Sequence, residues 1–170
     1  MIIILNHVSI WNVENLEREK FMDIKIENVP KYRIAYMRQI GPYGPTNIQT
    51  MQKLKNWAKE NKLFPKFSII LGISWDNPEI TPPENCRYDA GIIISNDYKI
   101  DDSVEESELV GGKYAIFKVE HTAEDIQKAW SEIFSMLQNS DFQIDDRPIF
   151  ERYIDEMVSN HFCEICVPIK

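Results

Sequence analysis

The sequence predicts an α+β domain built from two copies of a β-α-β-β unit, with a cleft between the copies. Two observations predict this fold class. The order strand, helix, strand, strand occurs twice along the 170 residues, and a tyrosine opens the first strand of each copy, Tyr32 and Tyr114. Neither copy can bury a core alone, so we expect two pseudo-symmetric units of antiparallel strands, each with one main helix, packed with both helices on one side.

The first copy spans about residues 22–97. The stretch "KYRIAYMRQIG" alternates well enough to predict a strand, which ends at the glycines and prolines of "GPYGP". Apolar residues then recur at helical spacing from Ile48 to Ala58 and predict a helix. The runs "FSIILGISW" and "CRYDAGIIIS" predict two further strands, because the prolines of "DNPEITPPEN" between them cannot continue a ladder.

The second copy spans about residues 110–170. "GGKYAIFKVEH" predicts its first strand, and Thr122 stands where a helix N-cap is expected, with Asp125 three residues later. The apolar stripe from Ile126 to Leu137 predicts the helix. "RPIFERYI" and "HFCEICVPI" predict two strands joined by a polar stretch. The acidic segment "NDYKIDDSVEESELVGG" between the copies predicts a solvated loop or mobile connector.

Composition suits a compact domain, since 44% of the residues are hydrophobic and 11% are aromatic. The start of the chain lacks the features of a signal peptide, and no apolar run reaches membrane-spanning length, so we expect a cytoplasmic protein without a membrane contact. A formal net charge of -8 disfavours direct binding to nucleic acid. Residues 1–21 fit neither copy; "VENLEREKF" could form a short amphipathic helix, but we assign this N-terminal extension no role.

Common catalytic and metal-binding signatures are absent from the sequence. Cys163 and Cys166 form a C-x-x-C, yet residues three apart in a strand point to opposite faces and cannot share a zinc ion. The histidines, His7, His121 and His161, show no metal-ligand spacing. We therefore expect no cofactor and no metal, and the sequence identifies no catalytic residue.

Two glutamates interrupt the apolar runs of the last two predicted strands. Glu151 shares a strand face with Tyr153, and Glu164 lies in a strand whose faces are otherwise mostly apolar. If these strands are neighbours, both carboxylates could face the cleft. A carboxylate in such surroundings is destabilised unless it is paired or takes up a proton. A ligand cation could supply the missing charge, or the strand could be an edge strand with water on one side. Alternatively, the protein supplies the partner from one of four residues: Arg33, Arg38, Lys118 or Arg152.

Aromatic rings would complete a cation site by placing their faces around the charge. Six residues are candidates for this role: Trp57, Trp130, Tyr36, Tyr43, Tyr153 and Phe117. Each ring could equally pack in the core, as aromatic residues in helix stripes usually do. The combination with the two glutamates indicates a ligand, so we take these six rings with Glu151 and Glu164 as the predicted ligand-binding residues.

From Met22 to the C-terminus the sequence resembles the GyrI-like family, which includes the effector-binding domains of AraC-type and MerR-type regulators and the DNA gyrase inhibitory protein. The resemblance rests on six stretches in the order and spacing of the family: "YRIAYMRQIGPYG", "SWDNPEITPPENCRYDAG", "GGKYAIFKVEHT", "AWSEIFSML", "DRPIFERYI" and "EICVPIK". It implies a duplicated fold in which a cleft glutamate pairs with lipophilic cations. "F-E-R-Y" makes Glu151 the best match to that residue and Glu164 the next. Cys166 stands where the family often has an aromatic or apolar residue.

Three functions remain open from the sequence. The first is a stand-alone effector-binding domain that senses or sequesters small lipophilic or cationic molecules, because the length leaves no room for a helix-turn-helix domain. The second is a protein-interaction inhibitor of the gyrase type, whose acidic surface would approach gyrase or a separate regulator. The third, implied by the resemblance, is a hydrolase of cyclopropane-bearing genotoxins that uses a glutamate as acid or base.

Overall fold

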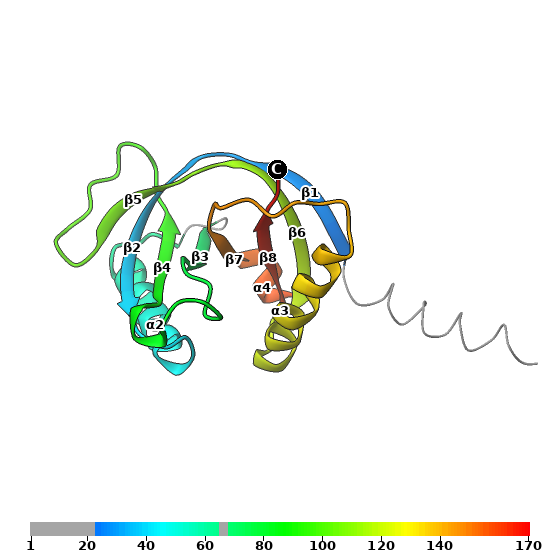
Figure 1. The fold of residues 1–170 in the computed structure, drawn as a ribbon. Coiled ribbons are helices and arrows are strands. Elements are labelled where there is room, and N and C mark those ends of the chain that lie inside the picture. Colours follow the sequence, from blue (N-terminus) through cyan, green and yellow to red (C-terminus); the bar gives the residue numbers. More distant parts are fainter. Residues whose placement is uncertain (1–22, 65–67) are drawn as a thin grey trace, which may run out of the picture.

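The computed structural model describes residues 23–64 and 68–170, and Figure 1 shows how their elements are arranged. The bounds of the helices and strands are β1 Asp23–Val29, β2 Tyr32–Ile40, α2 Pro45–Glu60, β3 Ile69–Ser74, β4 Arg87–Ile93, β5 Glu105–Leu109, β6 Gly112–Glu120, α3 Ala123–Gln138, β7 Ile149–Ile154, α4 Asp155–Ser159 and β8 Phe162–Pro168. A short 3-10 helix, Pro83–Asn85, precedes β4. The predicted N-terminal extension lies outside the described residues.

The eight strands form one antiparallel sheet in the order β1-β6-β8-β7-β3-β4-β2-β5. One β-α-β-β unit consists of β2, α2, β3 and β4, and the other of β6, α3, β7 and β8, which confirms the predicted fold class. The two units share a single sheet because β3 pairs directly with β7. Glu151 of β7 and Gly72 of β3 are opposite each other at this junction.

Four of the described elements are not predicted by the sequence pattern: the edge strands β1 and β5, the short helix α4 and the 3-10 helix. The prediction of a loop or mobile connector is wrong for residues 105–109, which form β5. Two glutamates of this strand contact β2. Arg33 Nε and Nη2 donate to Glu106 at 2.8 and 2.7 Å, and the Tyr36 hydroxyl donates to Glu105 at 2.8 Å. An acidic composition therefore marks an exposed edge strand here, a usual place for charged residues.

A long two-stranded ribbon connects the two units. β1 continues into β2, and β5 continues into β6, with two residues at each bend. The two bent segments pair in a single register, from Asp23 opposite Lys118 to Tyr36 opposite Glu105, and arch from one unit to the other across the top of Figure 1. At the bend, a Cβ atom on Gly111 would lie 2.5 Å from a carbonyl oxygen of β1, so only glycine fits there. β1, which leads into the first unit, is thus the edge strand of the second unit, and β5, which leads into the second unit, is the edge strand of the first.

Both long helices cover the same face of the sheet, as predicted. α2 packs on β2, β3 and β4 through one apolar cluster, and α3 packs on β6 and β8 through another. Pro45 begins α2, where a missing backbone N–H costs nothing. Thr122 caps α3 as predicted, since its hydroxyl accepts the Asp125 backbone N–H at 3.1 Å.

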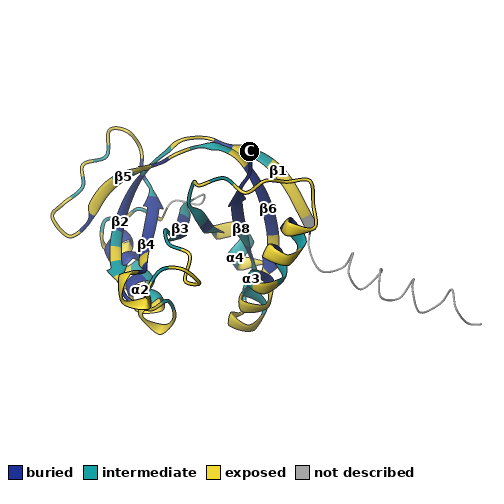
Figure 2. Ribbon diagram, in the orientation of Figure 1, coloured by how far each residue is buried: buried dark blue, intermediate teal, exposed yellow. Residues whose placement is uncertain are grey.

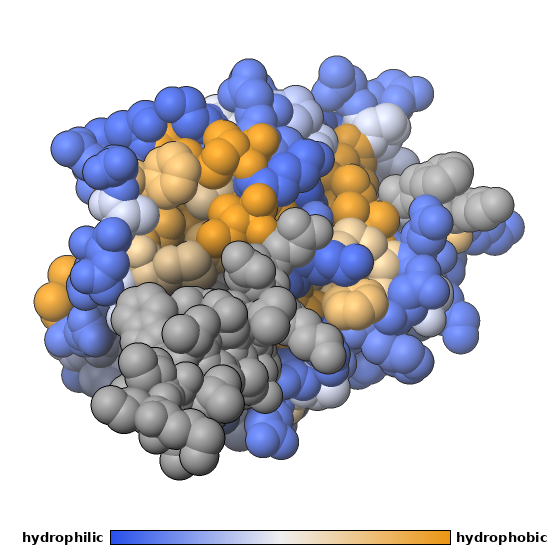
Figure 3. Space-filling model, turned by 90° about the vertical axis from the view of Figure 1, so that its right-hand side faces the viewer, coloured by the Kyte–Doolittle hydropathy of each residue, from blue (hydrophilic) through white to orange (hydrophobic). Residues whose placement is uncertain are grey.

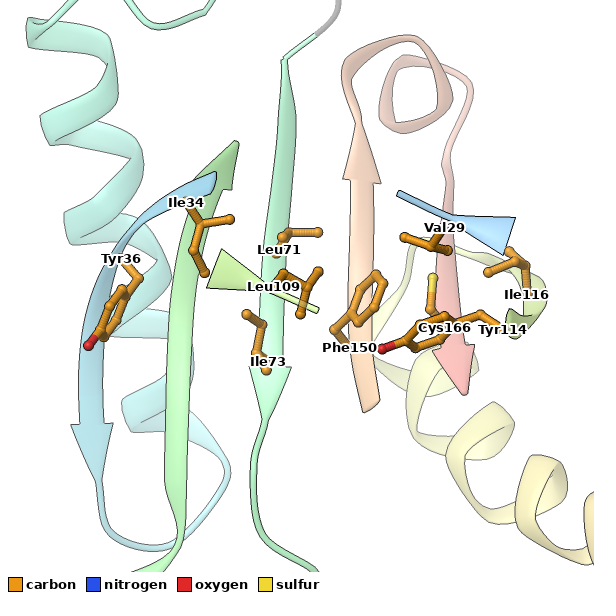
Figure 4. Packing of buried hydrophobic residues seen from close by; sticks show 10 residues of the cluster. All are labelled: Val29, Ile34, Tyr36, Leu71, Ile73, Leu109, Tyr114, Ile116, Phe150 and Cys166. Atoms are coloured by element: carbon orange, nitrogen blue, oxygen red, sulfur yellow. The ribbon is translucent and has the colours of Figure 1, made fainter. Parts of the chain in front are cut away.

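The face without the long helices has its own buried cluster, to which seven of the strands contribute: Val29, Ile34, Tyr36, Leu71, Ile73, Leu109, Tyr114, Ile116, Phe150 and Cys166. Figure 4 shows these side chains in a continuous layer across both units. In Figure 2 the central strands are mostly buried, whereas β5 and the outer surfaces of the helices are exposed. The two units therefore share a core on one face, while each helix packs mainly against its own unit on the other.

Candidate functional site

The strand β7, at the junction of the two units, carries the candidate glutamate. Side chains alternate along this strand, so Phe150 and Arg152 lie on the face without the long helices. Glu151 and Tyr153 lie on the face that α2 and α3 cover. The strands β3 and β7 run between these two helices (Figure 1). The Glu151 carboxylate therefore lies on the surface of the sheet, between α2 and α3.

Two neutral groups donate hydrogen bonds to the Glu151 carboxylate. Trp130 Nε1 of α3 donates to Oε1 at 2.8 Å, and the Tyr153 hydroxyl donates to Oε2. One turn along α3, the ring of Phe134 stacks on Trp130 with centroids 6.1 Å apart and an interplanar angle of 27°. Phe134 is 37% exposed, and Figure 3 shows hydrophobic residues at the surface on the side where α3 lies. A stack of two rings thus leads from the surface to the carboxylate.

Gly72 allows the Tyr88 hydroxyl to lie close to the backbone of β3 beside the carboxylate. A Cβ atom at this position would lie 2.8 Å from Tyr88 Oη and 3.4 Å from Glu151 Oε2. Burial and the charge of Glu151 raise the pKa of Tyr88, and the same two causes raise the pKa of Tyr153. Both phenols therefore stay protonated at neutral pH, and a third aromatic ring borders the carboxylate.

His121 lies at the edge of the same group. Its ring centroid is 5.3 Å from that of Tyr153, with an interplanar angle of 57°. Burial lowers the pKa of His121, and the charge of Lys55 lowers it further, whereas the charge of Glu151 acts in the opposite direction. A neutral imidazole adds an aromatic surface at pH 7 without adding a charge.

No basic side chain pairs with Glu151 among residues 23–64 and 68–170. The salt bridges in this part of the chain involve other acids. The carboxylate is therefore hydrogen-bonded by neutral groups, and its negative charge is not balanced by an ion pair.

The prediction that both carboxylates face the cleft is wrong for Glu164. β7 and β8 are neighbours, but their register puts Glu164 opposite Arg152, on the face without the long helices. Arg152 Nε donates to Glu164 at 2.6 Å, and Arg152 Nη1 donates to Glu27 at 2.9 Å. Only 5% of the Arg152 side chain is exposed. The alternative in which a basic side chain of the protein itself pairs with the glutamate is thus confirmed for Glu164.

The structure brings together three of the predicted ligand-binding residues: Glu151, Tyr153 and Trp130. The remaining four rings have other surroundings: Tyr36 lies on the opposite face and donates to Glu105, Tyr43 donates to the backbone before and within β4, Trp57 of α2 donates to a loop aspartate, and Phe117 is fully buried beneath α3. These four are part of the packing of the fold, and none of them hydrogen-bonds to the Glu151 carboxylate.

Four residues of the site are missing from the prediction: Gly72, Tyr88, His121 and Phe134. A signal for the first was available, because a glycine inside a strand often marks a close approach of other groups. Tyr88 shares a face of β4 with Ala90 and packs with it beneath α2, but only strand pairing brings Tyr88 toward Glu151.

Other chemistry has little support in the described part of the chain. No group of three or more His, Cys, Asp or Glu is placed there to hold a metal ion. The three cysteines are buried free thiols, and burial raises the pKa of Cys163 to about 12, so this thiol is not a nucleophile at neutral pH. None of the helices among residues 23–64 and 68–170 has the length and apolar character needed to cross a membrane.

Comparison with known proteins shows the family of this chain. Residues 22–170 match the model of the GyrI-like small molecule binding domain. The chain belongs to the GyrI-like family. YosT of Bacillus subtilis (strain 168), named as a candidate transcriptional regulator from the SPbeta prophage, is 43% identical over 150 residues, which are 88% of this chain and 100% of YosT. The DNA gyrase inhibitor of Salmonella typhimurium (strain LT2) is 28% identical over 148 residues, 85% of this chain and 94% of the inhibitor.

Solved structures share the fold of this GyrI-like chain. EcmrR in a complex with DNA has a TM-score of 0.71 and 12% identity; the match covers 95% of this chain and 62% of EcmrR, so the chain spans about three fifths of that protein. SAV2435 bound to tetraphenylphosphonium has a TM-score of 0.61 and 15% identity, with 88% and 94% covered. Identities this low establish a common fold and nothing more.

Proposed function

We propose that this GyrI-like chain is a cytoplasmic effector-binding domain that takes small lipophilic cations at Glu151. One observation carries the proposal: the Glu151 carboxylate has two neutral donors and no ion-pair partner among residues 23–64 and 68–170. The three free cysteines suit a reducing compartment.

The contrast with the other face of β7 supports this proposal. On that face, Arg152 pairs with both Glu27 and Glu164, and Lys25 also pairs with Glu27. On the helix face, Glu151 has only the indole and phenol groups of Trp130 and Tyr153. A ligand cation would supply the missing positive charge, and the surrounding rings would add cation-π attraction and apolar contact.

The comparisons support a small-molecule ligand without identifying it. The matching family model describes a small molecule binding domain, and one protein of the same fold is described as bound to tetraphenylphosphonium. That compound combines a positive charge with four aromatic rings, so it is a suitable first probe for a carboxylate among aromatic side chains.

Isothermal titration calorimetry of the wild type and Glu151→Gln tests the proposal. The probes are tetraphenylphosphonium and its neutral relative triphenylphosphine oxide. We expect the cation to bind the wild type and to lose at least about tenfold in affinity in Glu151→Gln, while the neutral compound responds equally to both. Glu105→Gln is the matched control, since Glu105 also accepts a tyrosine hydroxyl but lies on the opposite face. Equal cation affinity in wild type and Glu151→Gln would refute the proposal.

A protein partner is a second candidate, favoured by the relatives that are named DNA gyrase inhibitors. The acidic segment gives it less support than its composition suggests, because Glu106 and Glu108 of β5 already pair with Arg33 and Lys31. A gyrase supercoiling assay with the purified chain tests this candidate, and unchanged supercoiling at excess protein would count against it. Hydrolysis of cyclopropane-bearing genotoxins stays a prediction, to be tested by turnover above the rate in buffer.

A further inference from the structure

A pocket lies next to Glu151 on the same face of the sheet. It has a volume of about 210 Å³ and lies where β3 begins and β7 ends. Ile70 of β3 and Val158 of α4 provide apolar walls, and Lys55 of α2 and Asp155 of α4 provide polar ones. The pocket is therefore lined mainly by apolar groups, with opposite charges on two of its sides.

Tyr153 belongs to both the pocket and the carboxylate site. Its side chain lines the pocket, and its hydroxyl donates to Glu151 Oε2. The sheet register accounts for this position, since Tyr153 lies opposite Ile70 and Glu151 lies opposite Gly72, two residues further along β3. The Tyr153 side chain thus contacts both the pocket and the carboxylate.

The size of the pocket limits what it can hold alone. Pockets for drug-sized molecules have volumes of roughly 300–1,000 Å³, and this one has about 210 Å³. A drug-sized ligand that occupies this pocket and also reaches Glu151 must take the place of the Tyr153 hydroxyl, or of the whole Tyr153 ring. Beside the carboxylate, the Tyr88 hydroxyl occupies the space over Gly72, where a Cβ atom would lie 2.8 Å from it.

We propose that Tyr153 is a specificity-determining residue, which separates the pocket from Glu151 until a ligand displaces its hydroxyl. The ligand class is a two-part molecule, in which an apolar body occupies the pocket and a single cationic group takes the hydroxyl's place at Glu151. This inference rests on the proposed function, because it assigns a second part of the ligand to the same site. Small one-ring cations fit with the tyrosine ring in place, whereas bulky cations require the ring to move.

Two substitutions separate the effects of the hydroxyl and of the ring. In Tyr153→Phe the ring stays and the competing hydrogen bond is lost, so affinity for any cation should rise about tenfold, the equivalent of one charge-assisted hydrogen bond. In Tyr153→Ala the pocket and the carboxylate site merge, so bulky cations should gain affinity relative to small ones. The matched control is Tyr36→Phe, which removes a tyrosine-to-glutamate hydrogen bond on the opposite face.

The probes are benzyltrimethylammonium, a one-ring cation, and tetraphenylphosphonium, a bulky one, each titrated by calorimetry into the wild type and the variants. We expect the ratio of bulky to small cation affinity to rise in Tyr153→Ala and to stay at the wild-type value in Tyr36→Phe. Circular dichroism checks that each variant is folded. If Tyr153→Ala does not fold, Tyr153→Phe decides, because it retains the ring.

The possible results distinguish this inference from the proposed function. Cation binding that depends on Glu151 but keeps its affinity in Tyr153→Phe and its bulky-to-small ratio in Tyr153→Ala would overturn the inference and leave the proposed function standing. Cation binding that does not respond to Glu151→Gln would overturn both. A lower affinity of Tyr153→Phe for both cations would also overturn the inference, because the hydroxyl would then assist the ligand rather than compete with it.

Discussion

Replacing Glu27 by glutamine tests how strongly Arg152 ties the edge strand β1 to the sheet. Glu27 accepts hydrogen bonds from Arg152 at 2.9 and 3.1 Å, and these bonds lower the pKa of Glu27 from 4.5 to about 2. One pKa unit corresponds to about 1.4 kcal/mol, so the full change corresponds to about 3 kcal/mol. Because 23% of the Glu27 side chain is exposed, solvent screens the pair. We expect Glu27→Gln to reduce the free energy of unfolding by about 1–2 kcal/mol.

Urea denaturation at a series of pH values measures this difference. The folded chain binds fewer protons at Glu27 than the unfolded chain, so the stabilisation is present above pH 4.5 and is lost as the pH falls from 4.5 toward about 2. Over that range the stabilities of wild type and Glu27→Gln should converge. Glu108→Gln is the control, because its pair with Lys31 is exposed and should contribute little. Equal free energies of unfolding for wild type and Glu27→Gln at pH 7 would refute the reasoning.

Two further predictions concern the surroundings of the carboxylate. In Gly72→Ala the new Cβ would lie 2.8 Å from Tyr88 Oη, so the phenol must shift, and we expect a loss of about 1–2 kcal/mol in the free energy of unfolding together with weaker cation binding. Gly91→Ala, whose Cβ would meet nothing closer than 3.6 Å, should change neither quantity. Burial lowers the pKa of His121, so this ring gains its charge only below the ordinary value of 6.5 and then repels a cationic ligand. Calorimetry from pH 7 to 5 should therefore give falling cation affinity in the wild type and a smaller fall in His121→Phe; identical pH profiles would contradict this prediction.

Hydrophobic periodicity predicts the two long helices and the six inner strands of the sheet, and it misses the two edge strands. An inner strand has a neighbour on each side, so its sequence is largely apolar. An edge strand is exposed, and β5 reads EESEL for that reason. β1 reads DIKIENV, and its alternation is the signal that could have identified it, although Ile24 and Ile26 are 41% and 45% exposed. The strands with which β1 and β5 pair, β6 and β2, lie far from them in the sequence, so local periodicity cannot identify these pairings.

The site was predictable to the extent that it depends on a single strand or helix. Strand alternation puts Tyr153 beside Glu151 from the sequence alone. The face of Glu164 relative to Glu151 depends instead on the register of β7 with β8, and a shift of one residue would have reversed it. Trp57 and Trp130 both lie in apolar helix stripes, and only the packing of α3 against β7 brings Trp130 to the carboxylate.

The exchange of edge strands makes the two halves of the protein mutually dependent. β1 precedes the first unit in the sequence but pairs with β6 of the second unit. β5 precedes the second unit but pairs with β2 of the first. Cutting the chain between β4 and β5 would give two fragments, each of which holds a strand that only the other can accommodate. Such fragments should recombine as a complementary pair instead of folding as separate domains. Glu151 lies where β3 of the first half pairs with β7 of the second. A ligand bound there would therefore stabilise the contact between the two halves that the ribbon also joins.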